Sequence, residues 1–337
     1  MNTVDAPLYS PAPAWSGRDD GPGAEHARWH TVIRGLSLAD AAGSISTTTS
    51  PSDAPGAALL GFASDEGVAR NGGRQGAAAG PDAIRAALGS LAVHHAHPLY
   101  DAGTITTQGT DLEGAHAALA DAVASLTAAG HLPIVLGGGH ETAFGSHSGA
   151  YRALNLADGP QRGPLQVVNL DAHFDLRTAD APTSGTPFKQ ISQLVGPESF
   201  HYAVLGISRP NNTKVLFDEA ATLGVRVVED VELLDLTPSA AGRLAVDAAG
   251  GADADSPIHL SIDLDVLTAA QAPGVSAPAA LGVPLAHIRA MAVALAATGR
   301  LALVDVVELN PTFDIDGRTA KVAARLIDDI VTAHGGE

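Results

Sequence analysis

The 337-residue sequence contains no cysteine, little positive charge and no long uncharged apolar run. Without cysteine the chain can form no disulfide and no thiolate metal site, so any metal must be held by histidine, aspartate and glutamate. Its 19 Lys and Arg residues against 37 Asp and Glu residues give a net charge of −18. Such a surface argues against binding to nucleic acid or to anionic membranes.

No segment has the properties of a membrane span or of a secretory signal. The stretch 286–307 comes nearest to a span, but Arg289, Arg300 and Asp305 interrupt it. The first residues lack a basic segment followed by an apolar one. From the sequence we therefore expect a soluble, cytoplasmic protein.

The first 55 residues differ in composition from the rest. Prolines punctuate the start, and 44–55 is a polar, low-complexity stretch that would not build a core. We predict an N-terminal extension over 1–55, with one short helix around 37–42, and a catalytic domain over 56–337. Trp15 and Trp29 could dock on this body or on a neighbouring subunit; a loosely packed tail is the alternative.

From residue 57 onward, short apolar runs alternate with alanine-rich segments of helical spacing. The runs predict strands at 58–62, 133–136, 165–170, 202–207, 225–228, 258–266 and 301–309. The segments predict helices at 81–88, 112–129, 281–297 and 319–333. This alternation predicts a single three-layer α/β domain, with a mostly parallel sheet flanked by helices. Ligands bind such sheets at the carboxyl ends of the strands.

A run of three glycines follows one predicted strand and leads into His140 and Glu141. Glycines let the backbone turn sharply and approach another group closely. The run lacks the lysine of a phosphate-binding loop, and Thr142 stands where a dinucleotide fingerprint needs its third glycine. We expect His140 and Glu141 to face the crevice, although a lone histidine at such a place is more often structural.

A second strand end carries Asp171, His173 and Asp175 after the apolar run 165–170. Side chains alternate in direction along an extended chain, so these three would point the same way. A surface strand with solvated aspartates is the alternative, but the apolar run that leads into them indicates a buried strand. Isolated carboxylates would be costly to bury there, which favours convergence of the three side chains on a common ligand.

A third strand end carries Asp263 and Asp265, within the run 258–266. Apolar and polar residues alternate there, which would place both carboxylates on one face near the end of the strand. Solvated edge strands show the same pattern, so this pair gains weight only beside the other two segments.

Together, the three segments predict a site for two divalent cations. Two bare carboxylates about 4 Å apart repel by roughly 4 kcal/mol at an effective dielectric constant near 20, so four in one crevice would take up protons or bind cations. Two divalent ions would balance the four aspartates, with His140 and His173 as neutral ligands. This oxygen-rich set suits Mn²⁺ better than Zn²⁺ or Cu²⁺, and paired ions activate a shared water.

In this order the segments resemble the signature of the ureohydrolase family, which includes arginase and agmatinase. The motifs are GGGH at 137–140, DAHFD at 171–175 and SIDLD at 261–265, and family-like features extend from about residue 59 to residue 333. The resemblance implies an α/β domain with two Mn²⁺ ions per chain. One ion would be held by His140, Asp171, Asp175 and Asp263, and the other by Asp171, His173, Asp263 and Asp265.

The resemblance also implies catalytic roles for two carboxylates. Asp175 would orient a hydroxide that bridges the two ions. Glu308, in the sequence Glu-Leu-Asn-Pro, would grip the cationic C–N group under attack. Without the resemblance, Glu308 could equally be an ordinary carboxylate at a strand end.

Departures from the family pattern bear on the substrate. Ser184 and Phe188 occupy the two places where arginase and agmatinase carry a proton-shuttling histidine. Arg177 directly follows the second motif, where it would repel a cationic tail and could clamp a carboxylate in a bidentate manner. Other residues could add a local positive funnel for an anion, although solvated arginines in a glycine-rich turn are the alternative. These residues are Arg70, Asn71, Arg74, Lys189 and Arg209.

This combination is similar to the family members that hydrolyse N-formimidoyl-L-glutamate to L-glutamate and formamide in histidine breakdown. The resemblance therefore implies a small anionic amidine as substrate and, as is usual in the family, a homo-oligomer. One alternative is a hydrolase that releases urea from guanidinobutyrate or guanidinopropionate, with agmatinase or arginase less favoured. The alternative from another class is a catalytically silent metal-binding scaffold.

Overall fold

A ten-stranded sheet organises the part of the chain that the computed structural model describes, residues 8–41, 44–47, 54–158 and 163–336. Its order is β1-β6-β5-β7-β12-β11-β8-β9-β10, and β2 pairs with β6. The strands pair in parallel, except that β1 is antiparallel to β6. The strands of this sheet are β1 (Tyr9–Ser10), β2 (Arg34–Gly35), β5 (Ala57–Ala63), β6 (Leu99–Thr106), β7 (Leu132–Leu136), β8 (Gln166–Leu170), β9 (Tyr202–Ile207), β10 (Arg226–Glu229), β11 (Ile258–Asp263) and β12 (Leu301–Val307).

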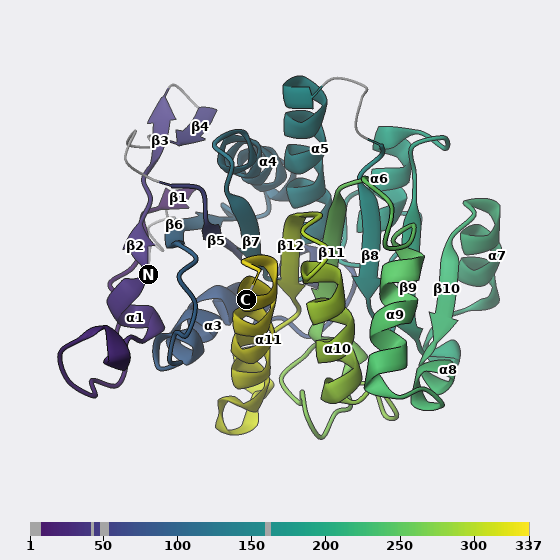
Figure 1. Ribbon diagram of the computed structural model, residues 1–337. Helices are drawn as coiled ribbons and strands as arrows, with labels where there is room; N and C mark the ends of the chain where they lie inside the picture. Colours follow the sequence, from purple (N-terminus) through teal and green to yellow (C-terminus); the bar gives the residue numbers. More distant parts are fainter. Residues whose placement is uncertain (1–7, 42–43, 48–53, 159–162, 337) are drawn as a thin grey trace.

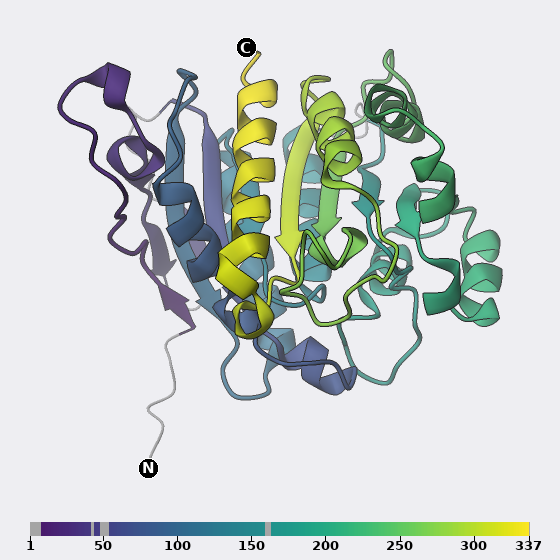
Figure 2. The ribbon, with the colours of Figure 1, turned by 90° about the horizontal axis from the view of Figure 1, so that it is seen from below.

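Helices cover both faces of this sheet (Figure 1; Figure 2). One face packs against α3 (Gly80–Gly89), α9 (Pro238–Ala248), α10 (Leu285–Ala296) and α11 (Arg318–His334), which share one apolar core with the strands. The other face packs against α4 (Leu112–Ala128), α5 (Thr142–Asp158), α6 (Pro187–Val195) and α7 (Lys214–Thr222). Two short helices, α2 (Glu66–Arg70) and α8 (Asp230–Leu234), lie in connections. The predicted three-layer α/β fold is confirmed.

The predicted strands and helices are present, with shifts that have local causes. The helix predicted from residue 281 begins only at Leu285, because Pro284 precedes it with an extended backbone. The strand predicted at 258–266 ends at Asp263, where a turn of 3₁₀ helix follows. Strand β6 was not predicted because Asp101 breaks its apolar pattern; this buried carboxylate pairs with Arg85 at 2.9 Å.

The short helix predicted around 37–42 is wrong. Residues Leu38–Ala41 form strand β3, which pairs antiparallel with β4 (Ser44–Thr47). A segment this short forms an isolated helix only weakly, so pairing with a neighbouring strand satisfies its backbone hydrogen bonds instead. Part of the polar stretch 44–55, residues 48–53, lies outside the described residues.

The segment before β5 is tied to the body of the protein. Strands β1 (Tyr9–Ser10) and β2 (Arg34–Gly35) join the main sheet through β6, and α1 (Trp29–Val32) lies between them. Trp29 is buried and its indole N–H donates to Asp328, while the indole of Trp15 donates to Asp101. Of the alternatives that the sequence left open, the structure shows docking of both tryptophans on the body, and the division at residue 55 stays a prediction.

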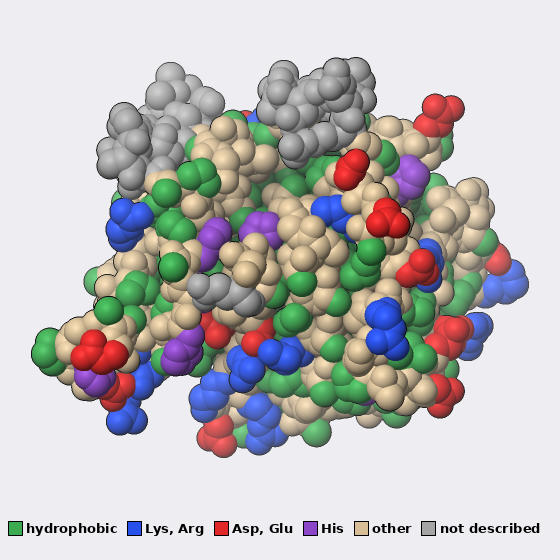
Figure 3. All heavy atoms as spheres, viewed as in Figure 1, with side chains coloured by type: hydrophobic (Ala, Val, Ile, Leu, Met, Phe, Trp, Pro, Cys, Tyr) green, Lys and Arg blue, Asp and Glu red, His purple; other side chains and the backbone are tan. Residues whose placement is uncertain are grey.

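Charge is unevenly spread over the face shown in Figure 3, where Lys and Arg side chains gather around the beginning of α11. Arg318, Lys321 and Arg325 of this helix line a hollow of about 280 Å³, together with one acidic residue, Asp316. A chain of net charge −18 thus presents a local positive region. Among the described residues, no helix combines the length and apolarity needed to cross a bilayer.

Candidate metal centre

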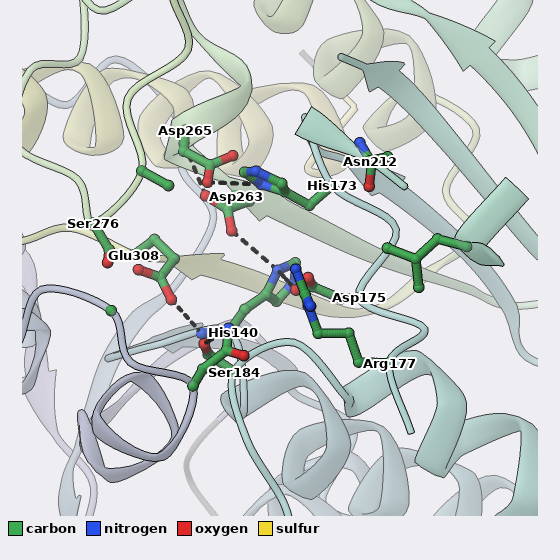
Figure 4. Close-up of a pocket in the computed structure, with 14 residues that line it drawn as sticks. His140, His173, Asp175, Arg177, Ser184, Asn212, Asp263, Asp265, Ser276 and Glu308 are labelled. Atoms are coloured by element: carbon green, nitrogen blue, oxygen red, sulfur yellow. Dashed lines mark hydrogen bonds and ion pairs between the residues drawn. The ribbon is translucent and has the colours of Figure 1, made fainter. Parts of the chain in front are cut away.

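A polar pocket of about 170 Å³ lies at the carboxyl ends of the central strands (Figure 4). Four adjacent strands in the order β7-β12-β11-β8 end at this edge. Each of them leads into at least one acidic or histidine side chain that lines the pocket or its floor. The chemistry expected from separate motifs therefore meets at one place.

The glycine run after β7 delivers His140 to this place. A Cβ on Gly138 would stand 1.7 Å from the carbonyl oxygen of Ser64, so only glycine fits there. The backbone N–H of His140 donates to Oε1 of Glu308 at 2.9 Å, and its Nε2 lies 3.0 Å from the hydroxyl of Ser261. With Nε2 occupied in this way, Nδ1 faces the pocket.

Asp171 and Asp175 both approach that ring nitrogen. Nδ1 of His140 lies 3.2 Å from a carboxylate oxygen of Asp171 and 2.9 Å from one of Asp175. The expected alternation along an extended strand is wrong, because β8 ends at Leu170 and Asp175 has φ +48°. The loop is held instead by Asn212, which donates to the carbonyl of Ala172 and accepts from the N–H of Phe174.

The two aspartates at the end of β11 point to different histidines. Asp263 ends the strand with a carboxylate oxygen 3.1 Å from Nδ1 of His140. Asp265 lies in the following 3₁₀ turn, 3.1 Å from Nδ1 of His173. The predicted same-face pair is therefore replaced by a turn in which Asp263 accepts a hydrogen bond from the N–H of Asp265, and the two carboxylates serve different neighbours.

Two groups of side chains could each hold a metal ion. The first contains His140, Asp171, Asp175 and Asp263, and the second contains Asp171, His173 and Asp265. Asp171 belongs to both, so the two positions share one carboxylate. The first group equals the set implied by the ureohydrolase resemblance, and the second lacks only Asp263.

The electrostatics of the cluster are those of a cation-binding site. Burial, together with the charges of Asp265 and Asp171, raises the pKa of Asp263 well above its usual range. Burial also raises the pKa of Asp265 to about 6, and the charge of Asp265 raises the pKa of His173 to about 12. Three carboxylates converge on Nδ1 of His140, and Oδ1 of Asp265 is buried without a hydrogen-bond partner among the described residues. The donor set, four carboxylates and two imidazoles, fits hard divalent ions such as Mn²⁺.

Glu308 lines the same pocket with an unusual backbone. Its φ of +67° is rare for a residue with a side chain and turns the carboxylate back toward His140. Oε2 has no hydrogen-bond partner among the described residues. Burial and the charge of Asp263 raise the pKa of Glu308 well above its usual range. A carboxylate placed in this way is free to meet a cationic group in the pocket.

The other side of the pocket carries three of the predicted substrate-binding residues. Arg177, Asn71 and Ser184 line it, and the amide of Asn71 donates to the hydroxyl of Ser184 at 3.1 Å. Among the described residues, the guanidinium of Arg177 has no hydrogen-bond or ion-pair partner, and it points toward the metal-ligand cluster (Figure 4). The pocket thus has a free cation beside its acidic floor.

Other predicted contributors are not brought into the pocket. Arg74 donates to the carbonyl of Ser276 at 2.8 Å and stacks on Phe313, so it supports the pocket wall from behind. Arg209 pairs with Glu229 at 2.8 Å outside the pocket. Arg70 and Lys189 are likewise paired, with Glu113 and Glu219 respectively. The predicted funnel is therefore reduced, within the pocket, to Arg177.

Glu141 was expected to face the crevice, and this is wrong. Its carboxylate turns away to accept hydrogen bonds from the N–H of Gly67 and the hydroxyl of Ser64. Sequence reasoning also missed Asn212 and Ser276, which line the pocket. The position of Asn212, just beyond the end of β9, is a signal that could have found it.

Comparisons with known proteins agree with this geometry. The model of the arginase family matches residues 55–332. The chain is 51% identical over 320 residues to the formimidoylglutamase of Corynebacterium efficiens, with 95% of each chain covered. It is 50% identical over 325 residues to that of Nocardia farcinica, with 96% of this chain and 97% of the relative covered.

Among solved structures, the chain resembles formiminoglutamase of Trypanosoma cruzi with Mn²⁺. The TM-score is 0.75 at 27% sequence identity, and the match covers 86% of this chain and 97% of the other. A family match over most of the chain, relatives of similar length and the shared fold lead to one conclusion: this chain belongs to the arginase family.

Proposed function

We propose that this protein hydrolyses N-formimidoyl-L-glutamate to L-glutamate and formamide, using two Mn²⁺ ions per chain. The observation that carries the proposal is the guanidinium of Arg177, which has no partner among the described residues and lies in the pocket that holds both metal-ligand groups. A substrate with a cationic amidine at one end and carboxylates at the other matches the acidic floor of the pocket and Arg177, respectively. The relatives that are about half identical to this chain are named for this activity.

His140, Asp171, Asp175 and Asp263 would hold one ion, and Asp171, His173 and Asp265 the other. A pair of divalent ions supplies a water of lowered pKa as the nucleophile. Asp263 would also serve the second ion, as the family resemblance implies.

The chain's own residues would bind and orient the substrate. Arg177 would form charge-assisted hydrogen bonds with a substrate carboxylate, which fixes the distance from that carboxylate to the amidine carbon. Oε2 of Glu308 would accept a hydrogen bond from the amidinium N–H, stabilising the positive charge at the carbon under attack. Because Arg177 binds a carboxylate and Glu308 binds the amidinium, the pocket favours N-formimidoyl-L-glutamate over guanidines with a cationic tail.

Proton transfer to the leaving amine must proceed without a histidine at the usual place. Phe188 is buried, with its ring edge against His140 and its face stacked on Tyr202. The proposed carriers are Asp175 and a water held near the hydroxyl of Ser184, which faces the pocket beside Asn71. Arginase and agmatinase activities are correspondingly disfavoured.

A substrate panel tests the proposal. The purified chain with added Mn²⁺ is incubated with N-formimidoyl-L-glutamate, guanidinobutyrate, agmatine and arginine, and the products are identified. We expect formamide and glutamate from the first compound and little urea from the others. Urea released from guanidinobutyrate at a higher kcat/KM would overturn the proposal in favour of a guanidino-acid hydrolase. Cytoplasmic location and homo-oligomeric assembly remain proposals from the sequence.

A further inference from the structure

The face of β11 that carries Asp263 is polar along its length. His259, Ser261 and Asp263 alternate along the strand on one side, and all three are buried. Ser261 reaches Nε2 of His140, and Asp263 reaches Nδ1 of the same ring. His259 is the member of the row for which the proposed reaction has no use.

His259 contacts helix α5, which begins directly after the His140 segment. Nδ1 of His259 lies 3.2 Å from Nδ1 of His147, one residue of α5. The two imidazoles are buried, and burial together with His259 lowers the pKa of His147 well below its usual range. A neutral His147 can donate one hydrogen bond to His259, which ties α5 to β11.

Asp305 joins the same group from β12. Its Oδ2 accepts from Nε2 of His259 at 2.6 Å and from the hydroxyl of Ser146, on α5, at 3.0 Å. Strand β12 ends two residues later, immediately before Glu308. The four side chains therefore connect α5, β11 and β12. His140 lies two residues before α5, Asp263 ends β11 and Glu308 directly follows β12.

This group is a costly way to hold a helix on a sheet. Oδ1 of Asp305 and Nε2 of His147 have no hydrogen-bond partner among the described residues, although both side chains are buried. Apolar side chains of similar volume commonly stabilise such an interior at least as well. They pack without directional constraint, however, whereas hydrogen bonds fix relative position. The polar group thus fixes the position of α5 on the sheet at a cost to the stability of the fold.

We propose that Ser146, His147, His259 and Asp305 form a positioning network that sets the placement of His140 relative to Asp263 and Glu308. The inference rests on the proposed di-manganese function, since the network would act on the position of ligands in the first metal-ligand group. Metal ligands must be held within a few tenths of an ångström of their preferred distances, and outer partners of ligands commonly change metal affinity by about 10–100-fold. The second group shares Asp171 with the first and also needs His173 and Asp265. Among the described residues, no hydrogen bond or ion pair links the network to His173 or Asp265.

The test measures Mn²⁺ binding to the metal-free full-length chain by isothermal titration, with unfolding in EDTA followed separately. Asp305→Asn keeps the shape and removes the charge that accepts both hydrogen bonds. We expect it to weaken one of two Mn²⁺ binding steps by about tenfold, while the other step changes less than about twofold. The double variant Ser146→Ala/His147→Leu frees α5 without altering either strand and should have the same selective effect.

Asp101→Asn is the matched control. Asp101 is also a buried carboxylate on a strand, and it accepts hydrogen bonds from Arg85 and Trp15 away from the metal groups. This variant should lower the unfolding temperature and leave both Mn²⁺ steps unchanged. A purely structural network would make Asp305→Asn behave in the same way, and that result overturns the inference.

The remaining outcomes are also decisive. If the wild-type chain binds no Mn²⁺, the proposed function fails, and the inference fails with it. If the wild type binds two ions and both network variants bind them equally well, only the positioning inference fails. If neither variant folds, the network is a folding element and the inference is overturned.

Discussion

Gly185 lies directly against the side chain of Arg177. The N–H of Arg177 donates to the carbonyl of Gly185 at 2.9 Å, and a Cβ on Gly185 would stand 2.8 Å from Cδ of Arg177. The same Cβ would lie 3.2 Å from the amide nitrogen of Asn71. Glycine at this position therefore leaves room for the arginine that faces the proposed substrate carboxylate.

Gly185→Ala should displace the Arg177 guanidinium without touching the metal ligands. We expect kcat/KM for N-formimidoyl-L-glutamate to fall by about tenfold, mainly through KM, with Mn²⁺ content unchanged. Steady-state kinetics and metal analysis measure the two quantities. Gly35→Ala is the control, because a Cβ there meets nothing within 4 Å. Loss of Mn²⁺ from the Gly185 variant would contradict this explanation.

Arg177→Ala should remove the proposed carboxylate clamp itself. Hydrogen bonds to charged groups contribute about 1.5–3 kcal/mol, so kcat/KM should fall by roughly 10–100-fold, again mainly through KM. Arg209→Ala is the matched control, because its guanidinium pairs with Glu229 outside the pocket. Unchanged kinetics in the Arg177 variant would refute its role in specificity.

The strand ends could be predicted from the sequence because apolar runs mark buried strands wherever they lie. Which strands lie next to one another in the sheet could not be predicted in this way. Asp171 and Asp263 are about ninety residues apart in the chain, yet they meet because β8 and β11 pair, with Leu170 opposite Ile262. Periodicity identifies faces and ends, whereas pairing order depends on how all helices pack on the sheet. The family resemblance, not the spacing, indicated which ends converge.

The substrate side was predicted less well, for a physical reason. A basic residue in a glycine-rich loop can bind a ligand or pair within the protein. Which of the two it does depends on the groups that the fold places next to it. Arg74 meets backbone carbonyls about two hundred residues away, at Val275 and Ser276. Every residue has a backbone carbonyl, so the sequence does not show which carbonyls accept these hydrogen bonds. Arg177 differs only in that no partner approaches it among the described residues.

Single substitutions in the metal groups should separate the two ions. Asp265 belongs only to the second group, and Asp171 belongs to both. Asp265→Ala should therefore retain about one Mn²⁺ per chain, whereas Asp171→Ala should lose most of both, because each removed carboxylate is a direct ligand. Atomic absorption on dialysed protein measures the content. Asp218→Ala, at an exposed carboxylate paired with Lys214, is the control. Equal metal loss in the Asp265 and Asp171 variants would contradict the separate groups.

Mn²⁺ binding should release protons and strengthen as the pH rises. In the metal-free chain the charge of Asp265 raises the pKa of His173 to about 12, so this ring is an imidazolium at neutral pH. A metal ligand must be the neutral imidazole, so the ion displaces a proton, and raising the pH favours the exchange. Calorimetry in two buffers of different ionisation enthalpy counts the protons, and titrations at pH 6 and pH 8 give the affinities. His173→Ala should release fewer protons than the wild type. Affinity that is independent of pH, with no buffer dependence of the heat, would show that His173 is not a ligand in the bound state.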